Sequence, residues 1–309
     1  MRTAWSLADL PPLDGRVYVI TGANSGLGRA CAGVLVAGGA RVVMACRDVA
    51  RAAAAAEALH STCGGVTAVV EPLDLADLAS VRGCATRVLE RYPRIDGLLL
   101  NAGLMAAARA RTADGLDLTF GVNHVGHFAL AAHLRPALRT ARVVSVSSLY
   151  HHVARYRPGD DPAHPSHASR GGSYADSKLA NLLFAFELDR RARAANLTLD
   201  STAAHPGFSA TDFQRRSARV GGSRLRASLS AIEVALFAQS AERGALPLLR
   251  ALTDPTVRGG AYLGPAGPFE VRGSSVAEAR TSAAARDTER AHALWELSER
   301  LAGLPFQLG

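Results

Sequence analysis

Lysine is almost absent from this sequence, which has 35 basic residues but only one lysine, Lys178. The four cysteines are scattered and form no Cys-x-x-Cys pair, which argues against a zinc site or a disulfide framework. No apolar run reaches the roughly 18 residues that a membrane span needs, and residues 1–15 lack the apolar core of a signal peptide. These absences predict a cytoplasmic protein with reduced thiols and no membrane span.

Aromatic residues are also sparse, at 6%, and the arginines are spread along the whole chain. A net charge of +8 would suit nucleic-acid binding, but basic patches interleaved with aromatic residues are missing. We therefore expect no nucleic-acid partner. The apolar content of 48% supports a sizeable core, and no linker divides the chain, so residues 1–309 are predicted to form one domain.

Short β-rich apolar runs alternate with helical patterns. Strands are expected at 16–21, 41–46, 66–71, 95–100, 142–147, 197–203 and 261–263, and helices at 26–37, 48–59, 77–91, 115–134, 174–195 and 287–302. This alternation is typical of βαβ units and a parallel sheet. We predict an α/β fold, a single Rossmann-type doubly wound parallel sheet with helices on both faces, which binds its ligand at the carboxyl ends of the strands.

A glycine-rich turn follows the first predicted strand and opens the first predicted helix. Its glycines, Gly22, Gly26 and Gly28, let the backbone approach a pyrophosphate, and the start of the helix offers amide donors. The spacing differs from Gly-x-Gly-x-x-Gly, so the strand-to-helix context carries the interpretation as a dinucleotide site.

Residues at the ends of the next two strands bear on which dinucleotide binds. Arg47 suits the 2′-phosphate of NADP, whereas the following Asp48 would suit the ribose of NAD or cap the next helix. We expect NADP(H) to be favoured over NAD(H). Asp74 is predicted to accept a hydrogen bond from the adenine amino group or to serve as a turn residue at the helix entry.

Tyr174 and Lys178 are four residues apart in a predicted helix, so both side chains lie on one face. A nearby ammonium favours phenolate and would lower the pKa of the tyrosine from about 10. The pair therefore predicts a general acid/base. The alternative is a surface lysine whose stem packs on the tyrosine ring.

Several motifs occur together in one order over residues 16–211. They are Thr21-Gly-x-x-x-Gly-x-Gly28, Asn101-Ala-Gly103, Asn123 in Val-Asn-His-Val-Gly-His, Ser148 after Val-Val-Ser-Val-Ser, Tyr174-x-x-x-Lys178 and His205-Pro-Gly207. In these the chain resembles the short-chain dehydrogenase/reductase family. The segment from Tyr174 onward looks like its branch of retinol dehydrogenases, WW-domain oxidoreductase and protochlorophyllide reductase.

The resemblance implies catalytic roles for four residues. Tyr174 would protonate an alkoxide or deprotonate an alcohol, and Lys178 would lower its pKa and hold the nicotinamide ribose. Ser148 would polarise the carbonyl, and Asn123 would hold a water that resupplies protons. Ser147 is a weaker candidate, because strand alternation sends it to the opposite face from Ser148.

The loop chemistry and the resemblance together assign a set of cofactor-binding positions. These are Gly22, Asn24, Ser25, Gly26, Leu27, Arg47, Asp74, Leu75, Asn101, Ala102, Gly103, Tyr174, Lys178, Pro206, Gly207 and Thr211. No metal is expected. The loop between Ser148 and Tyr174 holds four histidines (His151, His152, His164 and His167), but their spacing does not fix them to one helix face.

Residues 208–230 are predicted to form a lid that sets substrate specificity, and residues 255–309 a C-terminal extension. Apolar lid residues favour a lipophilic or aromatic small molecule, of the kind met in secondary metabolism, as the substrate of an NADP(H)-dependent carbonyl–alcohol oxidoreductase. Five arginines in 214–226 leave open a phosphate-bearing or carrier-bound substrate. A catalytically silent NADP-binding regulator is a further alternative.

The sequence leaves the quaternary structure open. A homodimer or homotetramer formed through helices near 115–134 and 174–195 is what the resemblance implies, and the C-terminal extension could block or extend such contacts.

Overall fold

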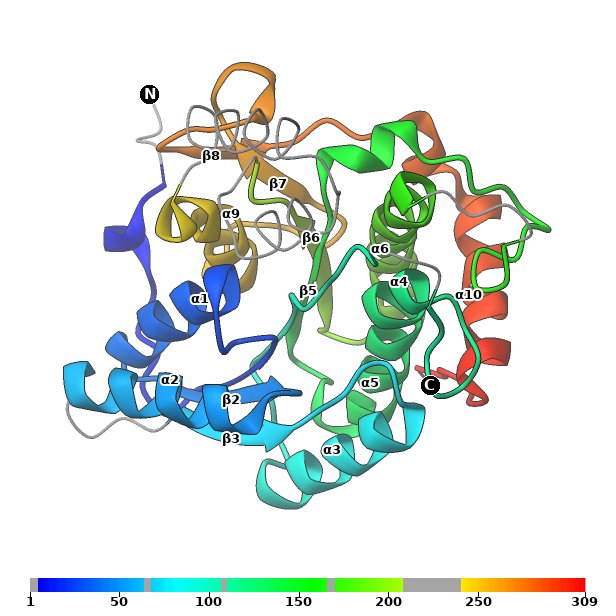
Figure 1. The fold of residues 1–309 in the computed structure, drawn as a ribbon. Coiled ribbons are helices and arrows are strands. Elements are labelled where there is room, and N and C mark those ends of the chain that lie inside the picture. The colour runs from blue at the N-terminus through cyan, green and yellow to red at the C-terminus, as the bar shows by residue number, and fades with distance from the viewer. Residues whose placement is uncertain (1–4, 64–67, 107–109, 166–169, 208–239, 309) are drawn as a thin grey trace, which may run out of the picture.

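A largely parallel β-sheet forms the centre of the molecule (Figure 1). The structure is a computed structural model that describes residues 5–63, 68–106, 110–165, 170–207 and 240–308. In these ranges the strand order is β3-β2-β1-β4-β5-β6-β7-β8, and only the β7–β8 pair is antiparallel. The strands are β1 (Val17–Thr21), β2 (Arg41–Cys46), β3 (Ala68–Pro72), β4 (Gly97–Leu100), β5 (Arg142–Val146), β6 (Asp200–Ala204), β7 (Tyr262–Pro265) and β8 (Val276–Glu278).

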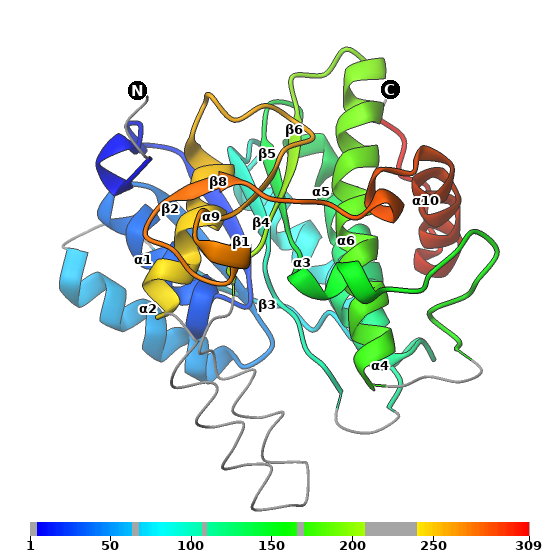
Figure 2. The same cartoon turned by 90° about the horizontal axis from the view of Figure 1, so that it is seen from above.

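Helices cover both faces of the sheet, which confirms the predicted fold class (Figures 1 and 2). One face carries α1 (Gly26–Ala37), α2 (Val49–Cys63) and α9 (Ala241–Thr253). The other carries α3 (Leu78–Arg91), α5 (Gly126–Leu134) and α6 (Arg170–Ala194), with α10 (Thr288–Ala302) outside them. The shorter helices are η1 (Leu7–Asp9), α4 (Leu118–Phe120), η2 (Gly121–Val125), η3 (Arg135–Ala137), η4 (Leu149–Val153), η5 (Pro268–Glu270) and η6 (Ala283–Arg286).

Alternation along the strands explains why a fully apolar strand can serve two cores. Val17 and Val19 of β1 belong to the core under α3, α5 and α6, whereas Tyr18 and Ile20 belong to the core under α1 and α9. Successive side chains of a strand point to opposite faces, so a strand buried on both sides shows a continuous apolar run.

The expected element boundaries agree closely with those of the structure in the first half of the chain, where α1 and β2 have the predicted limits. The helix expected at 115–134 is interrupted, because η2 is a π-helical turn between α4 and α5. Helix α9 was not expected from the sequence. It contains Pro247, which removes a helical hydrogen-bond donor and makes the segment resemble a loop.

The C-terminal extension contributes to both sides of the sheet. It supplies β7 and β8, crosses the molecule, and ends in α10, which lies against α6 (Figure 2). Trp295 of α10 is 2% exposed, and its ring centroid lies 5.2 Å from that of Phe128 and 5.9 Å from that of Phe184. Faces of α5 and α6 that would otherwise be open are therefore covered by the chain itself.

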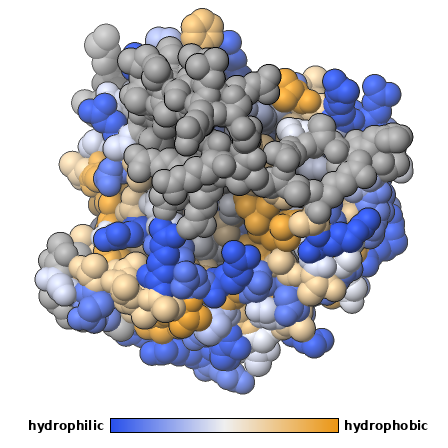
Figure 3. All heavy atoms as spheres, in the orientation of Figure 1, coloured by the Kyte–Doolittle hydropathy of each residue, from blue (hydrophilic) through white to orange (hydrophobic). Residues whose placement is uncertain are grey.

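The surface is mixed in character. The face shown in Figure 3 is mainly hydrophilic at its edge and has an apolar patch over the region of α4. Among the residues that the structure describes, no helix is both long enough and apolar enough to cross a bilayer.

Replacing the tryptophan of α10 tests how strongly the extension is attached. Trp295→Ala removes a large buried ring from a cluster of aromatic side chains, so we expect the free energy of unfolding to fall by about 3–5 kcal/mol. Urea denaturation followed by circular dichroism measures this. The neighbouring Glu296→Ala, at a side chain that is 56% exposed, should change stability by only about 0.5 kcal/mol, and equal effects of the two variants would contradict the packing.

Candidate active site

The glycine-rich turn joins β1 to α1 in a tightly packed loop. Gly22 and Gly26 have positive φ angles of 68° and 54°, which side chains disfavour. A Cβ on Gly28 would lie 2.6 Å from both the Asn101 side-chain nitrogen and the Gly22 carbonyl, so no larger residue fits without displacement. The Ser25 side chain makes no capping hydrogen bond to α1, which leaves the first amides of the helix to other acceptors.

Asn101 and Ala102 fix this loop from the neighbouring strand. Both backbone amides donate to the Thr21 hydroxyl at 2.9 Å, and the Asn101 side chain donates to the Thr21 carbonyl at 2.8 Å. Gly103 continues this turn beside Lys178, since a Cβ there would lie 3.6 Å from the Lys178 Nζ, an ordinary van der Waals contact. Thus Asn101 and Ala102, two of the three predicted cofactor residues in this motif, hold the glycine-rich loop through their hydrogen bonds to Thr21.

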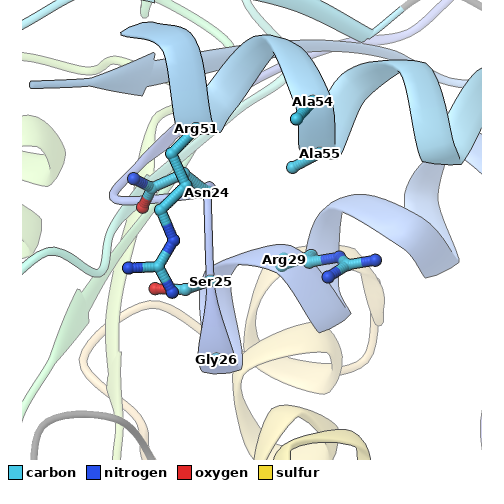
Figure 4. A pocket seen from close by; sticks show the side chains of 7 residues that line it. All are labelled: Asn24, Ser25, Gly26, Arg29, Arg51, Ala54 and Ala55. Carbon is cyan, nitrogen blue, oxygen red and sulfur yellow. The ribbon is translucent and has the colours of Figure 1, made fainter. Parts of the chain in front are cut away.

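A cavity of about 310 Å³ opens beside the loop, between α1 and α2 (Figure 4). Arg51 extends from α2 across Asn24 toward Ser25, and Arg29 lies on α1 (Figure 4). The small side chains of Ala54 and Ala55 keep the space between the two helices open. The lining residues are Asn24, Ser25, Gly26, Arg29, Arg51, Ala54 and Ala55.

The acidic residues near this end of the sheet serve largely as caps. Asp48 accepts a hydrogen bond from the Arg51 amide at 3.0 Å, so it caps α2, whereas Arg47 is exposed. One Asp74 carboxylate oxygen accepts from the Ala76 amide at 2.9 Å, which gives Asp74 the turn role that the sequence allowed. The buried Leu75 follows it and packs against Gly126.

Ser148 and Tyr174 meet at the carboxyl end of β5. Ser148 is the N-cap of η4, where its hydroxyl accepts from the Tyr150 amide at 3.3 Å, and it also lies close to the Tyr174 side chain. Burial raises the pKa of Tyr174 above its ordinary value, and the Ser148 side chain lowers it less strongly. The direction is opposite to the one expected from a neighbouring lysine, because desolvation of the phenolate dominates. Ser147 faces away and donates to the Lys178 carbonyl at 2.8 Å.

Lys178 lies beneath the tyrosine and is only 4% exposed. Its ammonium donates to the Val146 carbonyl at 3.0 Å and lies 5.5 Å from the centre of the Tyr174 ring. Burial lowers the pKa of Lys178 to about 8. The proximity expected from the i, i+4 spacing is present, and the side chain is not a surface lysine.

Asn123 lies in the π-helical turn η2, fully buried. Its side chain exchanges hydrogen bonds with the backbone of Leu104, at 2.8 and 2.9 Å, and donates to Ser177 at 3.0 Å. Its carbonyl accepts from Nδ1 of His127, whose Nε2 is 2.9 Å from the Thr21 hydroxyl. Asn123 therefore connects the active-site helix to the glycine-rich loop, while the water relay suggested for it stays a prediction.

The His-Pro-Gly motif follows β6 at the same end of the sheet. Gly207 has a φ of 67°, and a Cβ there would lie 2.4 Å from the Val271 carbonyl, so the C-terminal extension closes over this turn. Pro206 precedes it in the half-buried part of the turn. Thr211 and the lid predicted at 208–230 lie outside the described residues.

Three residues of interest were not selected from the sequence. Arg29 and Arg51 come from different helices, and only the fold brings them to one cavity. Tyr150 is 49% exposed, and its ring centroid lies 5.4 Å from that of Tyr174 in an edge-to-face arrangement. Its position two residues after Ser148 was the available signal.

The structure places no group of three or more metal-ligating side chains together within the described ranges.

A doubly wound sheet with a glycine-rich loop after β1, and a serine, a tyrosine and a lysine at the end of β5, defines a dinucleotide-binding oxidoreductase fold. Residues 16–219 match the family model described as short chain dehydrogenase. The chain belongs to the short-chain dehydrogenase/reductase family, which confirms the resemblance seen in the sequence.

Characterised relatives extend this match. Human retinol dehydrogenase 12 is 40% identical over 208 residues, which cover 66% of this chain and 65% of that protein, just under two thirds of its length. Human retinol dehydrogenase 14 is 36% identical over 94% of this chain and 88% of its own. The crystal structure of an uncharacterised protein from Mycobacterium paratuberculosis covers 99% of this chain and 100% of its own, with 38% identity and a TM-score of 0.81.

Two glycines of α1, one tightly surrounded and one not, provide a test of the loop. Gly28→Ala places a methyl group against Asn101 and the Gly22 carbonyl, and we expect it to weaken dinucleotide binding at least about tenfold and to destabilise the fold by about 1–3 kcal/mol. Gly33→Ala is the matched control, because the nearest atom there, of Leu59, is 3.4 Å away. Cofactor fluorescence titration and thermal denaturation measure both, and an unchanged dissociation constant for Gly28→Ala would contradict the close approach.

Proposed function

We propose that the chain is an NADP(H)-dependent oxidoreductase that interconverts a carbonyl and an alcohol on a lipophilic small molecule. The observation that carries the proposal is the cluster at the end of β5. There the Ser148 side chain lies close enough to the Tyr174 hydroxyl to lower its pKa, and the buried ammonium of Lys178 lies 5.5 Å from the centre of the same ring. A catalytically silent binding protein would have no use for a desolvated lysine beneath a tyrosine that a serine also approaches.

The protonation states suit the reductive direction. With its pKa raised by burial, Tyr174 keeps its proton near neutral pH and is able to donate it to an alkoxide. Ser148 adds a hydrogen-bond donor to the same oxygen, where negative charge develops. Lys178, with a pKa of about 8, is mainly charged at pH 7 and stabilises negative charge on the tyrosine after the transfer. Hydride chemistry is supplied by the nicotinamide cofactor when it is bound.

The preference for NADP(H) is supported by the charges around the loop. Arg29 and Arg51 line the cavity beside the start of α1, and Arg47 is exposed at the end of β2. Asp48, the residue that would suit the ribose of NAD, is engaged as the cap of α2. Guanidinium groups bind phosphate well, so this corner fits a 2′-phosphate better than a 2′-hydroxyl.

A lipophilic substrate is supported by the surface next to Tyr174. Tyr150 and Val153 of η4 are 49% and 66% exposed, which is high for large apolar side chains. The relatives named for retinol act on a lipophilic molecule according to their names. The arginines at 214–226, on which a phosphate-bearing or carrier-bound substrate would depend, lie outside the described residues.

Removal of the tyrosine hydroxyl is the central test. In assays of NADPH oxidation with a panel of ketones and aldehydes, Tyr174→Phe should lower kcat by roughly 10²–10⁴-fold, the usual contribution of a general acid. Tyr150→Phe makes the same change on the neighbouring ring and should retain activity within a few-fold. A fully active Tyr174→Phe enzyme would show that the mechanism is wrong.

Cofactor choice has its own test. Arg51→Ala should raise KM for NADPH by about tenfold or more, since hydrogen bonds to charged groups contribute about 1.5–3 kcal/mol, and should leave KM for NADH nearly unchanged. Arg139→Ala, at an exposed arginine just before β5, serves as the control for a lost positive charge. A wild-type enzyme with the higher kcat/KM for NADH, or an equal loss with both cofactors, would overturn the assignment.

A further inference from the structure

We propose that the C-terminal segment, residues 262–302, positions the active site through three buried histidines, His124, His151 and His205. This inference rests on the proposed catalytic roles of Ser148 and Lys178. The three side chains are 2%, 1% and 0% exposed, and each contacts a different part of the segment on one side and a different motif of the active site on the other. They are positioning residues and do not touch the reacting atoms.

His151 links the segment to the catalytic serine. Its Nδ1 is 2.7 Å from the Ser148 carbonyl, and its Nε2 accepts the backbone N–H of Ser282 at 3.2 Å. A carbonyl only accepts and an amide only donates, so Nδ1 carries the proton and Nε2 carries none. Burial also lowers the pKa of His151 to about 4, which keeps this neutral tautomer at working pH. Ser148 is thereby attached to Ser282, the N-cap of η6.

His124 links α10 to the lysine. Its Nε2 is 2.7 Å from the Ser298 hydroxyl, which itself donates to the Leu294 carbonyl. On its other side His124 lies close enough to the Asn181 side chain for this group to offset part of the lowering of the His124 pKa by burial, and Asn181 donates to the Val146 carbonyl at 3.0 Å. That carbonyl is the acceptor of Lys178. The position of α10 therefore affects the Val146 carbonyl, which is the atom that holds the Lys178 ammonium.

His205 links the turn after β7 to the His-Pro-Gly motif. Its Nδ1 accepts the Gly207 amide at 3.2 Å, so its Nε2 carries the proton; this atom lies 3.4 Å from the Glu270 carboxylate, a close polar contact without hydrogen-bond geometry. Phe269 and Glu270 have φ angles of 55° and 59°, which non-glycine residues seldom adopt. Strained backbone of this kind persists where its surroundings hold it, and here Glu270 also accepts from the Arg280 amide at 3.0 Å.

A simpler explanation is that each histidine merely satisfies a polar group in the core. That explanation requires polar partners, but it does not require them to be the Ser148 carbonyl, the Asn181 side chain that donates to the Val146 carbonyl, or the Gly207 amide. Displacements of about 1 Å at catalytic groups can cost up to 100-fold in rate, so contacts at these atoms affect kcat before they affect substrate binding.

Substitutions at Ser282 separate positioning from stability. Ser282→Pro removes the N–H that His151 accepts, and the φ of −67° already suits proline. Ser282→Ala is the matched control, because both variants lose the serine side-chain cap of η6 but alanine keeps the N–H. We expect kcat for Ser282→Pro to fall about tenfold or more relative to Ser282→Ala, with KM for the carbonyl substrate changed less than about twofold.

Hydrogen exchange provides a measurement that does not depend on turnover. Ser282→Pro should speed exchange of the amides at 149–153 about tenfold relative to Ser282→Ala. Should the wild type reduce no carbonyl, the proposed function fails while this exchange comparison still tests the contact. Equal exchange and equal kcat in the two variants would overturn the proposal.

A second pair covers the possibility that Ser282→Pro does not fold. Ser298→Ala removes the hydroxyl that contacts His124, and Thr253→Val removes an equivalent buried hydroxyl bonded to the Leu249 carbonyl in α9. We expect the two variants to have similar melting temperatures. We expect kcat to fall several-fold in Ser298→Ala and to stay unchanged in Thr253→Val. If kcat follows the melting temperature in both variants, the histidine contacts are structural and the proposal is wrong.

Discussion

Burial of one ammonium group at the carboxyl end of β5 is the constraint on which the rest of the site depends. Lys178 is nearly inaccessible to water, so its charge needs compensation from fixed dipoles, and the Val146 carbonyl supplies one. Gly103 lies beside Lys178, since a Cβ there would be in van der Waals contact with the ammonium at 3.6 Å. An arginine, which is planar and larger, would not replace the lysine there. A chain that otherwise uses arginine throughout keeps lysine at this position for reasons of size and of an adjustable pKa.

The helical arrangement around the lysine is also adapted to it. The π-helical turn η2 widens the backbone between α4 and α5 and directs Asn123 toward both Leu104 and Ser177. Turns of this type often occur at functional sites, because an extra residue alters the directions of side chains. His127 then connects this turn to Thr21, so the glycine-rich loop and α6 share a continuous set of hydrogen bonds.

Much of the fold could be predicted because its signals are local. The limits of α1 and β2 follow from apolar runs bounded by glycine, and the four catalytic candidates follow from motifs of short spacing. The π-helical turn could not be predicted, because a one-residue insertion barely changes the apolar periodicity of a helix. Helix α9 could not be predicted either, because Pro247 makes its sequence resemble a loop. Arg29 and Arg51 and the contacts of the C-terminal segment depend on residues far apart in sequence. The pKa of Tyr174 was misjudged because burial cannot be read from a motif.

The scarcity of lysine gives the molecule an unusual chemical property. Apart from the amino terminus, the chain has a single primary amine, and that amine is 4% exposed beneath a tyrosine ring. Acylating reagents that consume accessible amines elsewhere in proteins have no other side chain of this type to modify. Covalent labelling of the folded protein at its side-chain amine would therefore report the opening of one small region, the floor of the candidate active site, without any engineered probe.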